Sequence, residues 1–257
     1  MHIVVCMKQV PRDNSVKINP DLSINADGIE KIINLFDEYA IEEGIVWNER
    51  HGGKLTVLSL GTQEWVEQMR RALAMGATDA LLLSDPSFAS LDTIAAAKVV
   101  AAAIRKLGDV DLIFCGRNST DDESGAFAPA LARALGWPQL TYVGKVLELD
   151  PAGKTISVER HLEAVVETVN APLPAVVSVV KDINEPRYPS LLKIKRVARV
   201  EPPVWSAADL GVSVESAATL AARVPPPARP KGEIIDGPDA AAKVKKLVDK
   251  LLENQII

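Results

Sequence analysis

The sequence contains few of the residues on which common catalytic and metal sites depend. Its 257 residues include two cysteines and three histidines. Cys6 and Cys115 both lie in apolar, strand-like runs, so we expect packed thiols in a reducing compartment and no disulfide framework. There is no Cys-x-x-Cys, His-Glu-x-x-His or Gly-x-Ser-x-Gly pattern. We therefore predict no metal site, and a hydrolase lacks its nucleophile and base signatures.

The usual glycine-rich phosphate motifs are also missing. No Gly-x-Gly-x-x-Gly follows the first apolar run, and no Gly-x-x-x-x-Gly-Lys-Ser/Thr occurs. The dinucleotide fingerprint and the P-loop are therefore both absent, which removes the best support for a kinase or an ATPase.

Long apolar runs and an excess of basic residues are lacking too. The net charge of -5 argues against a nucleic-acid-binding protein, which needs a dense basic face. No stretch approaches the roughly 18 to 20 apolar residues of a membrane span. Met1 leads directly into an apolar run without a basic region and a cleavage site, so we expect no signal peptide and a cytoplasmic protein.

What the sequence does contain is an alternation of apolar runs and helical segments. This alternation predicts an α/β fold whose mostly parallel sheet is flanked by helices. The expected strands are Ile3–Met7, Leu55–Leu60, Ala80–Leu83 and Leu112–Cys115. The expected helices, each ending near a glycine, are Asp37–Glu49, Glu64–Met75, Asp92–Leu107 and Ala126–Leu135.

The second half of the chain follows a different pattern. Two β-rich runs, 140–149 and 155–160, flank a Pro-Gly turn and predict an inserted β-hairpin, and a further strand is expected at 175–180. From Pro186 onward prolines interrupt any long element, which predicts an extended C-terminal arm. The arm ends in an amphipathic helix over 239–254. We expect an α/β nucleotide-binding domain over 1–188, and a partner-recognition loop with the arm and terminal helix over 189–257.

The segment after Asp111 is the strongest candidate for a binding site. An apolar run ends at Gly116 and is followed by small, hydroxyl-bearing and acidic residues up to Pro129. In an open parallel sheet such a loop lies at the carboxyl edge of the strands, where ligands bind. A strand–helix loop that holds no ligand would show the same pattern.

Several blocks in this order resemble the beta subunit of electron transfer flavoprotein. The blocks are Val5-Cys-Met-Lys-Gln-Val-Pro, Ile33-Asn-Leu-Phe-Asp-Glu-Tyr-Ala-Ile-Glu-Glu, Arg71-Ala-Leu-Ala-Met-Gly-Ala, the Gly116 loop, Gly136-Trp-Pro-Gln, Val158-Glu-Arg, Leu173-Pro-Ala-Val-Val and Asn184-Glu-Pro-Arg-Tyr. The resemblance implies an adenine-nucleotide-binding chain that pairs with an alpha subunit and forms part of the wall around that subunit's FAD. The heterodimer would carry electrons from flavin-dependent dehydrogenases, such as acyl-CoA dehydrogenases, to an acceptor, without catalysis by this chain alone.

The resemblance also implies which residues bind AMP. They are Cys6, Asn34, Leu35, Phe36, Asp37, Leu60, Gly116, Arg117, Asn118, Ser119, Thr120, Asp121, Asp122, Glu123, Ser124, Gly125, Ala126 and Phe127. We expect Gly116 to let the backbone approach the ligand and a helix starting near Ser124 to point its amides at a phosphate. Because carboxylates repel phosphate, we expect the three acidic residues to face outward or cap the helix, which leaves neutral donors and Arg117 for the phosphate.

The nucleotide itself stays open between two candidates. AMP-binding members of the family often carry Asn-Gln-Thr where this chain has Gly125-Ala126-Phe127, whose side chains donate no hydrogen bonds. In the electron-bifurcating branch, which uses NADH, a second FAD occupies the AMP position. A third alternative is a stand-alone adenine-nucleotide-binding domain.

Two further positions carry expectations about function. His161 follows the Val158-Glu-Arg block, where the family usually has an acid near the flavin, so His161 would tune the flavin; the alternative is a strand-edge histidine that faces solvent. Leu191 aligns with the family's anchor for dehydrogenases. Lys193, Lys195 and Arg196 beside it would steer an acidic partner, or would form an ordinary solvated segment.

Overall fold

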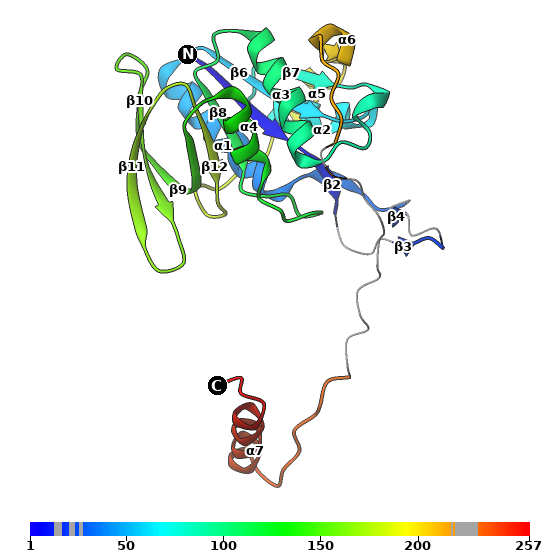
Figure 1. Cartoon of the computed structure of the whole chain (residues 1–257), viewed down its shortest axis with the longest axis vertical. Helices are drawn as coiled ribbons and strands as arrows, with labels where there is room; N and C mark the ends of the chain where they lie inside the picture. Colours follow the sequence, from blue (N-terminus) through cyan, green and yellow to red (C-terminus); the bar gives the residue numbers. More distant parts are fainter. Residues whose placement is uncertain (13–16, 21–23, 26–27, 217, 219–230) are drawn as a thin grey trace. The chain divides into compact units, whose positions relative to one another are not determined.

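The computed structural model describes residues 1–12, 17–20, 24–25, 28–216, 218 and 231–257. Its contacts divide the chain into two compact units, Met1–Ala221 and Ala222–Ile257, which are described separately. The first unit contains a mixed α/β fold with a large, mostly parallel sheet flanked by helices (Figure 1), so the predicted fold class is confirmed. The functional division predicted between residues 188 and 189 lies within the first unit and stays a prediction.

The sheet has nine strands in the order β11-β10-β9-β12-β8-β1-β6-β7-β13. From β9 to β13 every neighbouring pair is parallel, whereas β10 is antiparallel to both β9 and β11. The strands are β1 (His2–Met7), β6 (Lys54–Leu60), β7 (Asp79–Leu83), β8 (Leu112–Gly116), β9 (Gln139–Asp150), β10 (Thr155–His161), β11 (Val166–Pro172), β12 (Ala175–Val179) and β13 (Val204–Trp205). The short strands β2 (Gln9–Pro11) and β5 (Lys31–Ile33), and β3 (Lys17–Ile18) and β4 (Ile24–Asn25), form two small antiparallel pairs.

Strand β1 lies inside the sheet and is buried on both faces. Ile3, Val5 and Met7 belong to the apolar cluster that includes α1 (Leu35–His51) and α2 (Val66–Met75). Val4 and Cys6 belong to a second cluster with α3 (Thr93–Leu107) and α4 (Phe127–Leu135). Because successive side chains of a strand point to opposite faces, this division assigns the two pairs of helices to opposite faces of the sheet.

The expected helix ends agree closely with the structure. Glycines are the C-cap residues of α1, α2, α3 and α4, at Gly52, Gly76, Gly108 and Gly136. At the start of α3 the side chain of Asp92 accepts a hydrogen bond from the Ala95 amide, so an N-terminal amide without a helical partner is satisfied.

The connections define where the direction of winding changes. From β1 the chain passes through α1 to β6 and through α2 to β7 on one side. Helix α3 then returns it to β8, which lies on the other side of β1. In such sheets ligands bind outside the carboxyl ends of the two strands where the order reverses. That position here lies beyond Met7 and Gly116.

The predicted hairpin is part of a three-stranded antiparallel ribbon. Strands β9, β10 and β11 form one edge of the sheet, at the left in Figure 1. The sequence analysis found the first two strands but not β11. All residues of β11 are exposed or half-buried, so it has no apolar run of the kind that marks a buried strand.

The segment after residue 189 is more structured than a loop and an open arm. Helix α5 (Leu191–Val197) replaces the expected recognition loop, and the Ser190 side chain accepts a hydrogen bond from the Lys193 amide at its start. Strand β13 then pairs with β7 at the sheet edge, and α6 (Ala207–Leu210) follows. The expected arm therefore carries short elements over these residues and, as predicted, no long one. Pro225, Pro226, Pro227 and Pro230 lie outside the described residues.

The second unit contains the amphipathic helix that the sequence predicts. Helix α7 (Ala240–Glu253) begins after Asp239, whose side chain accepts a hydrogen bond from the Ala242 amide. The apolar residues Val244, Leu247 and Val248 of this helix are exposed. Among the described residues, no helix is both long and apolar enough to cross a lipid bilayer.

Candidate functional site

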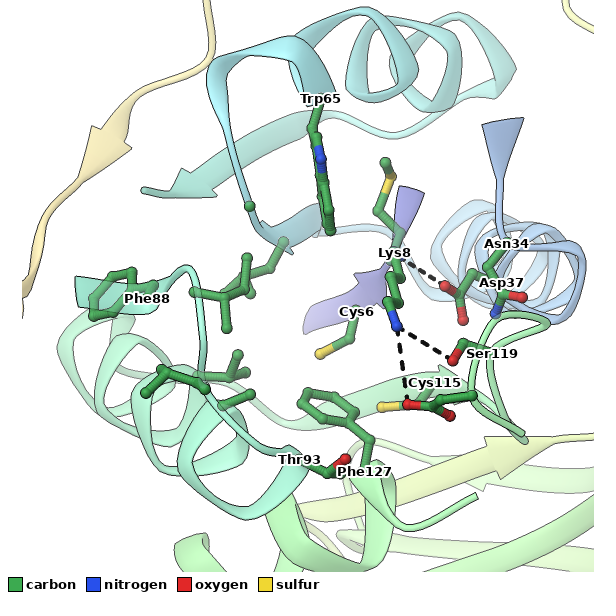
Figure 2. A pocket seen from close by; sticks show the side chains of 18 of the residues that line it. Cys6, Lys8, Asn34, Asp37, Trp65, Phe88, Thr93, Cys115, Ser119 and Phe127 are labelled. Atoms are coloured by element: carbon green, nitrogen blue, oxygen red, sulfur yellow. Dashed lines mark hydrogen bonds and ion pairs between the residues drawn. The ribbon is translucent and has the colours of Figure 1, made fainter. Parts of the chain in front are cut away.

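A cavity of about 860 Å³ opens at the position where the winding changes direction (Figure 2). Segments following β1, β6, β7 and β8 contribute to its wall, together with α3 and the start of α4. Among the described residues, no cluster of three or more His, Cys, Asp or Glu could hold a metal ion. The predicted residues that line the cavity are Cys6, Asn34, Asp37, Leu60, Gly116, Arg117, Asn118, Ser119, Asp122, Ser124, Gly125 and Phe127.

Six of the predicted residues do not line this cavity: Leu35, Phe36, Thr120, Asp121, Glu123 and Ala126. Leu35 and Phe36 line a second cavity of about 430 Å³ instead, together with Arg187 and Tyr188. Helical geometry accounts for this, because neighbouring residues at the start of α1 point in different directions from Asn34 and Asp37.

Asp37 joins the ends of the two central strands. Its Oδ2 accepts a hydrogen bond from the Lys8 amide at 2.7 Å, and its Oδ1 accepts one from the Gly116 amide at 3.1 Å. The side chain is buried, and burial raises its pKa to about 7 against the lowering effect of these hydrogen bonds. Asp37 therefore fixes α1 to β1 and β8, and it titrates near neutral pH.

Gly116 is required for packing between the loop and α1. A Cβ atom at this position would lie 2.5 Å from Asp37 Oδ1 and 2.7 Å from Phe36 Cβ. The close neighbour of Gly116 on this side is the first turn of α1, and Gly116 also lines the cavity, so its approach to a ligand stays a prediction.

Asn34 holds the loop that follows Gly116. Its Nδ2 donates to the Asn118 carbonyl at 2.9 Å, and its Oδ1 accepts a hydrogen bond from the Thr120 amide at 3.2 Å. Asn118 Oδ1 is itself buried at the cavity wall and accepts no hydrogen bond within the described part of the chain. A ligand group that donates a hydrogen bond would satisfy this oxygen.

Lys8 is a cation of the cavity that the sequence analysis missed. Its Nζ lies 2.7 Å from Asp121 Oδ2 and 3.4 Å from Ser119 Oγ. Asp121 is exposed and does not line the cavity, as expected for a residue that faces outward, and it pairs with Lys8 there. Arg117, expected at the phosphate, lines the cavity with its guanidinium 4.8 Å from the centre of the Tyr142 ring. The position of Lys8 could have indicated this role, because the residue directly follows the carboxyl end of β1.

The acidic residues that precede α4 form a turn with a hydrogen bond inside it. Asp122 Oδ1 accepts a hydrogen bond from the Ser124 amide at 2.9 Å. Partial burial works to raise the pKa of Asp122, but this hydrogen bond and the Lys8 charge lower it overall. Helix α4 starts at Phe127 with Ala126 at the N-cap, so the helix start expected near Ser124 is also corrected. Any phosphate held by its amides would lie near Phe127.

The remaining wall is mainly apolar and comes from segments that the sequence analysis left out. Gly61–Trp65 follow β6, while Phe88 and Leu91 follow β7. Figure 2 shows the Trp65 ring projecting into the cavity and Phe88 on another side of it. Gly61 allows this, because a Cβ atom there would come within 2.3 Å of the indole ring. The indole and phenyl rings can stack on an aromatic ligand.

His161 lies outside this cavity, at the end of β10. A Cβ atom on Gly144 would lie 2.2 Å from the imidazole Nδ1, so the ring rests on the β9 backbone. Its Nε2 is 3.9 Å from Glu159 Oε2, and the side chain is about half-exposed. The ring is neither buried nor free in solvent.

The segment around Leu191 presents an apolar surface with basic residues. Leu191 and Leu192 are each 78% exposed, and Lys195 and Arg196 are exposed as well. Lys193 is exposed too, but its Nζ donates a hydrogen bond to the Met75 carbonyl at 3.4 Å.

Arg187 fixes the start of this segment to α1. Its guanidinium lies 2.9 Å from Glu42 Oε1 and 2.7 Å from Glu49 Oε1, and these hydrogen bonds raise the pKa of Arg187. Asn184 Nδ2 donates to Glu43 Oε2 at 2.9 Å close by. Three glutamates of α1 therefore hold Asn184 and Arg187 against this helix.

The fold and cavity together define a doubly wound α/β protein of the class that binds ligands at the carboxyl ends of its central strands. The family described as "Electron transfer flavoprotein domain" matches residues 21–210. The chain therefore belongs to the electron transfer flavoprotein family and is of the beta-subunit type.

Three relatives illustrate the relationship. "Electron transfer flavoprotein subunit beta" of Thermoanaerobacterium thermosaccharolyticum is 38% identical and covers 100% of both chains. "Protein FixA" of Azorhizobium caulinodans is 38% identical over 82% of this chain and 77% of its own. "Caffeyl-CoA reductase-Etf complex subunit CarD" of Acetobacterium woodii is 35% identical and covers 100% of both chains.

Proposed function

We propose that this chain is the beta subunit of a heterodimeric electron transfer flavoprotein and that it binds an adenine nucleotide in the 860 Å³ cavity. The observation that carries this proposal is the convergence of the Asn34, Asp37 and Gly116–Phe127 segments on one cavity at the change of winding. The chain positions redox centres and partners and carries out no bond-forming step alone. A structural AMP is the simplest ligand of this site.

A second candidate, FAD in the same cavity, is favoured by the apolar wall. The volume lies near the upper end of the roughly 300–1,000 Å³ typical of small-molecule sites, which leaves room for a dinucleotide. Lys8, Ser119 and the α4 amides would hold phosphates, and Trp65 with Phe88 would contact a ring system. FAD, when bound, supplies one- and two-electron transfer. This alternative corresponds to a bifurcating subunit that works with NADH.

Nucleotide content distinguishes the candidates. The chain is purified with its alpha subunit and denatured, and released AMP and FAD are quantified for each heterodimer. One FAD with one AMP supports the carrier that holds a structural AMP, because the single FAD belongs to the alpha subunit. Two FAD without AMP support the bifurcating form. A stable single chain that hydrolyses ATP would contradict both.

We also propose that the α5 surface docks flavin-dependent dehydrogenases such as acyl-CoA dehydrogenases. The exposed Leu191 would enter a pocket of the partner, and Lys195 and Arg196 would attract an acidic rim. The name of the Acetobacterium woodii relative, which belongs to a complex with caffeyl-CoA reductase, supports a partner that acts on a CoA thioester. Helix α7 would bind the alpha subunit, and His161 would lie near its flavin.

Leu191→Ala tests the docking proposal against a matched control. We expect it to slow electron transfer from the dehydrogenase about tenfold or more, as for an interface anchor worth ~2 kcal/mol, without changing flavin content. Leu192→Ala removes an equally exposed leucine from the same helix and should have a smaller effect. Equal effects of the two variants, or loss of flavin from Leu191→Ala, would refute the assignment of Leu191 as the anchor.

A further inference from the structure

The two cysteines of the chain are neighbours on adjacent strands. The parallel pairing of β1 with β8 sets Val4 beside Ile113 and Val5 beside Phe114. The next step along both strands brings Cys6 beside Cys115. Both belong to the apolar cluster on the α3 and α4 side of the sheet, so their side chains point to the same face.

This arrangement suits a disulfide bond. Neighbouring strands lie about 4.8 Å apart, within the roughly 4.4–6.8 Å Cα separation of disulfides. Both cysteines are free thiols. The side chains of Cys6 and Cys115 interact with each other, and both cysteines lie near the strand ends, where β1 and β8 pass into loops.

The two thiols are buried from bulk solvent but open to the cavity. Cys6 is 7% exposed and Cys115 is 2% exposed, and both line the cavity wall. Figure 2 shows them between Lys8 and Phe127. A small reagent that enters the cavity therefore meets both sulfur atoms, whereas a bound nucleotide would cover them.

The environment gives the two thiols different roles. The interaction with Cys6, then burial and the nearby Asp37 charge, raise the pKa of the Cys115 thiol well above its usual value. Cys115 therefore stays protonated and is a poor initial nucleophile. The first attack on an oxidant falls to Cys6, which is the more exposed of the two.

We propose that Cys6 and Cys115 form an oxidisable dithiol at the floor of the cavity, closed to an intramolecular disulfide by low-molecular-weight disulfides of the glutathione type. The Cys6 thiolate attacks one sulfur of the oxidant, forms a mixed disulfide and releases one thiol. Cys115 then loses its proton and attacks the Cys6 sulfur, which releases the second thiol. The two cysteines lose two electrons and two protons, and the oxidised disulfide becomes two thiols.

Oxidised glutathione is the probe that tests the dithiol. The full chain with its alpha subunit is reduced, freed of nucleotide and treated with the probe; it is then denatured, alkylated and analysed by mass spectrometry. We expect a product two hydrogen masses lighter that carries neither an alkyl group nor glutathione on either cysteine. Cys115→Ala should trap glutathione on Cys6, and Cys6→Ala should leave Cys115 reduced. Stable glutathione on Cys115, or two thiols that stay reduced in the wild type, would overturn the proposal.

The protection by nucleotide rests on the proposed function and is measured separately. With AMP or FAD at about ten times its Kd, the empty fraction of the cavity falls about tenfold, and the oxidation rate should fall with it. A disulfide that forms at the same rate with and without nucleotide upholds the dithiol and contradicts nucleotide binding over it. Failure of the dithiol and failure of the nucleotide assignment are therefore distinguishable.

Discussion

Replacing Asp37 with asparagine should change how the stability of the protein depends on pH. Burial raises the pKa of Asp37 from 3.8 to about 7, so the folded protein holds this proton more tightly than the unfolded chain. The stability that the protonated carboxyl contributes is fully present below about pH 4 and is lost as the pH rises through 7. Asparagine carries no such proton, so Asp37→Asn should remove this dependence.

The size of the effect follows from proton linkage. Between the two pKa values the free energy of unfolding falls by up to ~1.36 kcal/mol per pH unit, or about 2 to 3 kcal/mol from pH 5 to pH 8. Asparagine has only one acceptor oxygen, so the amide of Lys8 or of Gly116 loses its partner. Relative to the wild type with a protonated carboxyl, that loss costs about 1 to 3 kcal/mol, and the variant carries it at every pH, whereas the wild type loses its own 2 to 3 kcal/mol as the pH rises to 8. The variant should be clearly weaker at pH 5 and close to the wild type at pH 8.

Urea unfolding of both proteins at several pH values measures this difference. His2 titrates in the same range, with its pKa lowered mainly by burial, so its contribution to stability is lost as the pH falls below 6.5. Because His2 is present in both proteins, its contribution cancels in their difference. Glu163→Gln, at an exposed carboxylate between β10 and β11, serves as the control and should run parallel to the wild type. If Asp37→Asn also runs parallel to the wild type, the assigned titration is wrong.

Two other substitutions follow from the contacts described above. Arg187→Met leaves the buried carboxylate of Glu42 without its cation. We expect the free energy of unfolding, measured in urea, to fall by about 3 kcal/mol. Arg187→Lys keeps a cation at this position, so its free energy of unfolding should fall less. Gly61→Ala places a methyl group against the Trp65 ring, so the ring must move. We expect nucleotide content after purification to fall while far-UV circular dichroism is retained. Unchanged content would mean that the ring does not shape the nucleotide site.

The central part of the fold could be predicted from the sequence because its signals are local. Continuous apolar runs mark the buried parallel strands, and a glycine ends each of the four main helices. Strand β11 and helix α5 lack such signals, since neither has a buried residue. The two-residue β13 is fixed by its pairing with β7, which no local pattern reveals.

Only one wall of the candidate site could be predicted from the sequence. The loop from Gly116 to Phe127 is continuous in sequence and resembles one family pattern, so it could be recognised. The opposite wall, including Trp65 and Phe88, comes from separate segments that meet only in the folded sheet. The contact of Gly116 with the first turn of α1 likewise depends on how α1 packs, which no local pattern reveals.

Helix α1 contacts both the candidate cavity and the segment that leads into α5. Its first turn, with Asn34 and Asp37, fixes the wall of the cavity, while Glu42, Glu43 and Glu49 hold the segment that leads into α5. An uninterrupted helix is rigid over these few turns, so α1 keeps a fixed distance between the cavity wall and the segment that leads into α5. In the proposed function, an electron carrier depends on constant spacing between the group that it binds and the protein that it docks. Under that proposal, one uninterrupted helix would set this spacing.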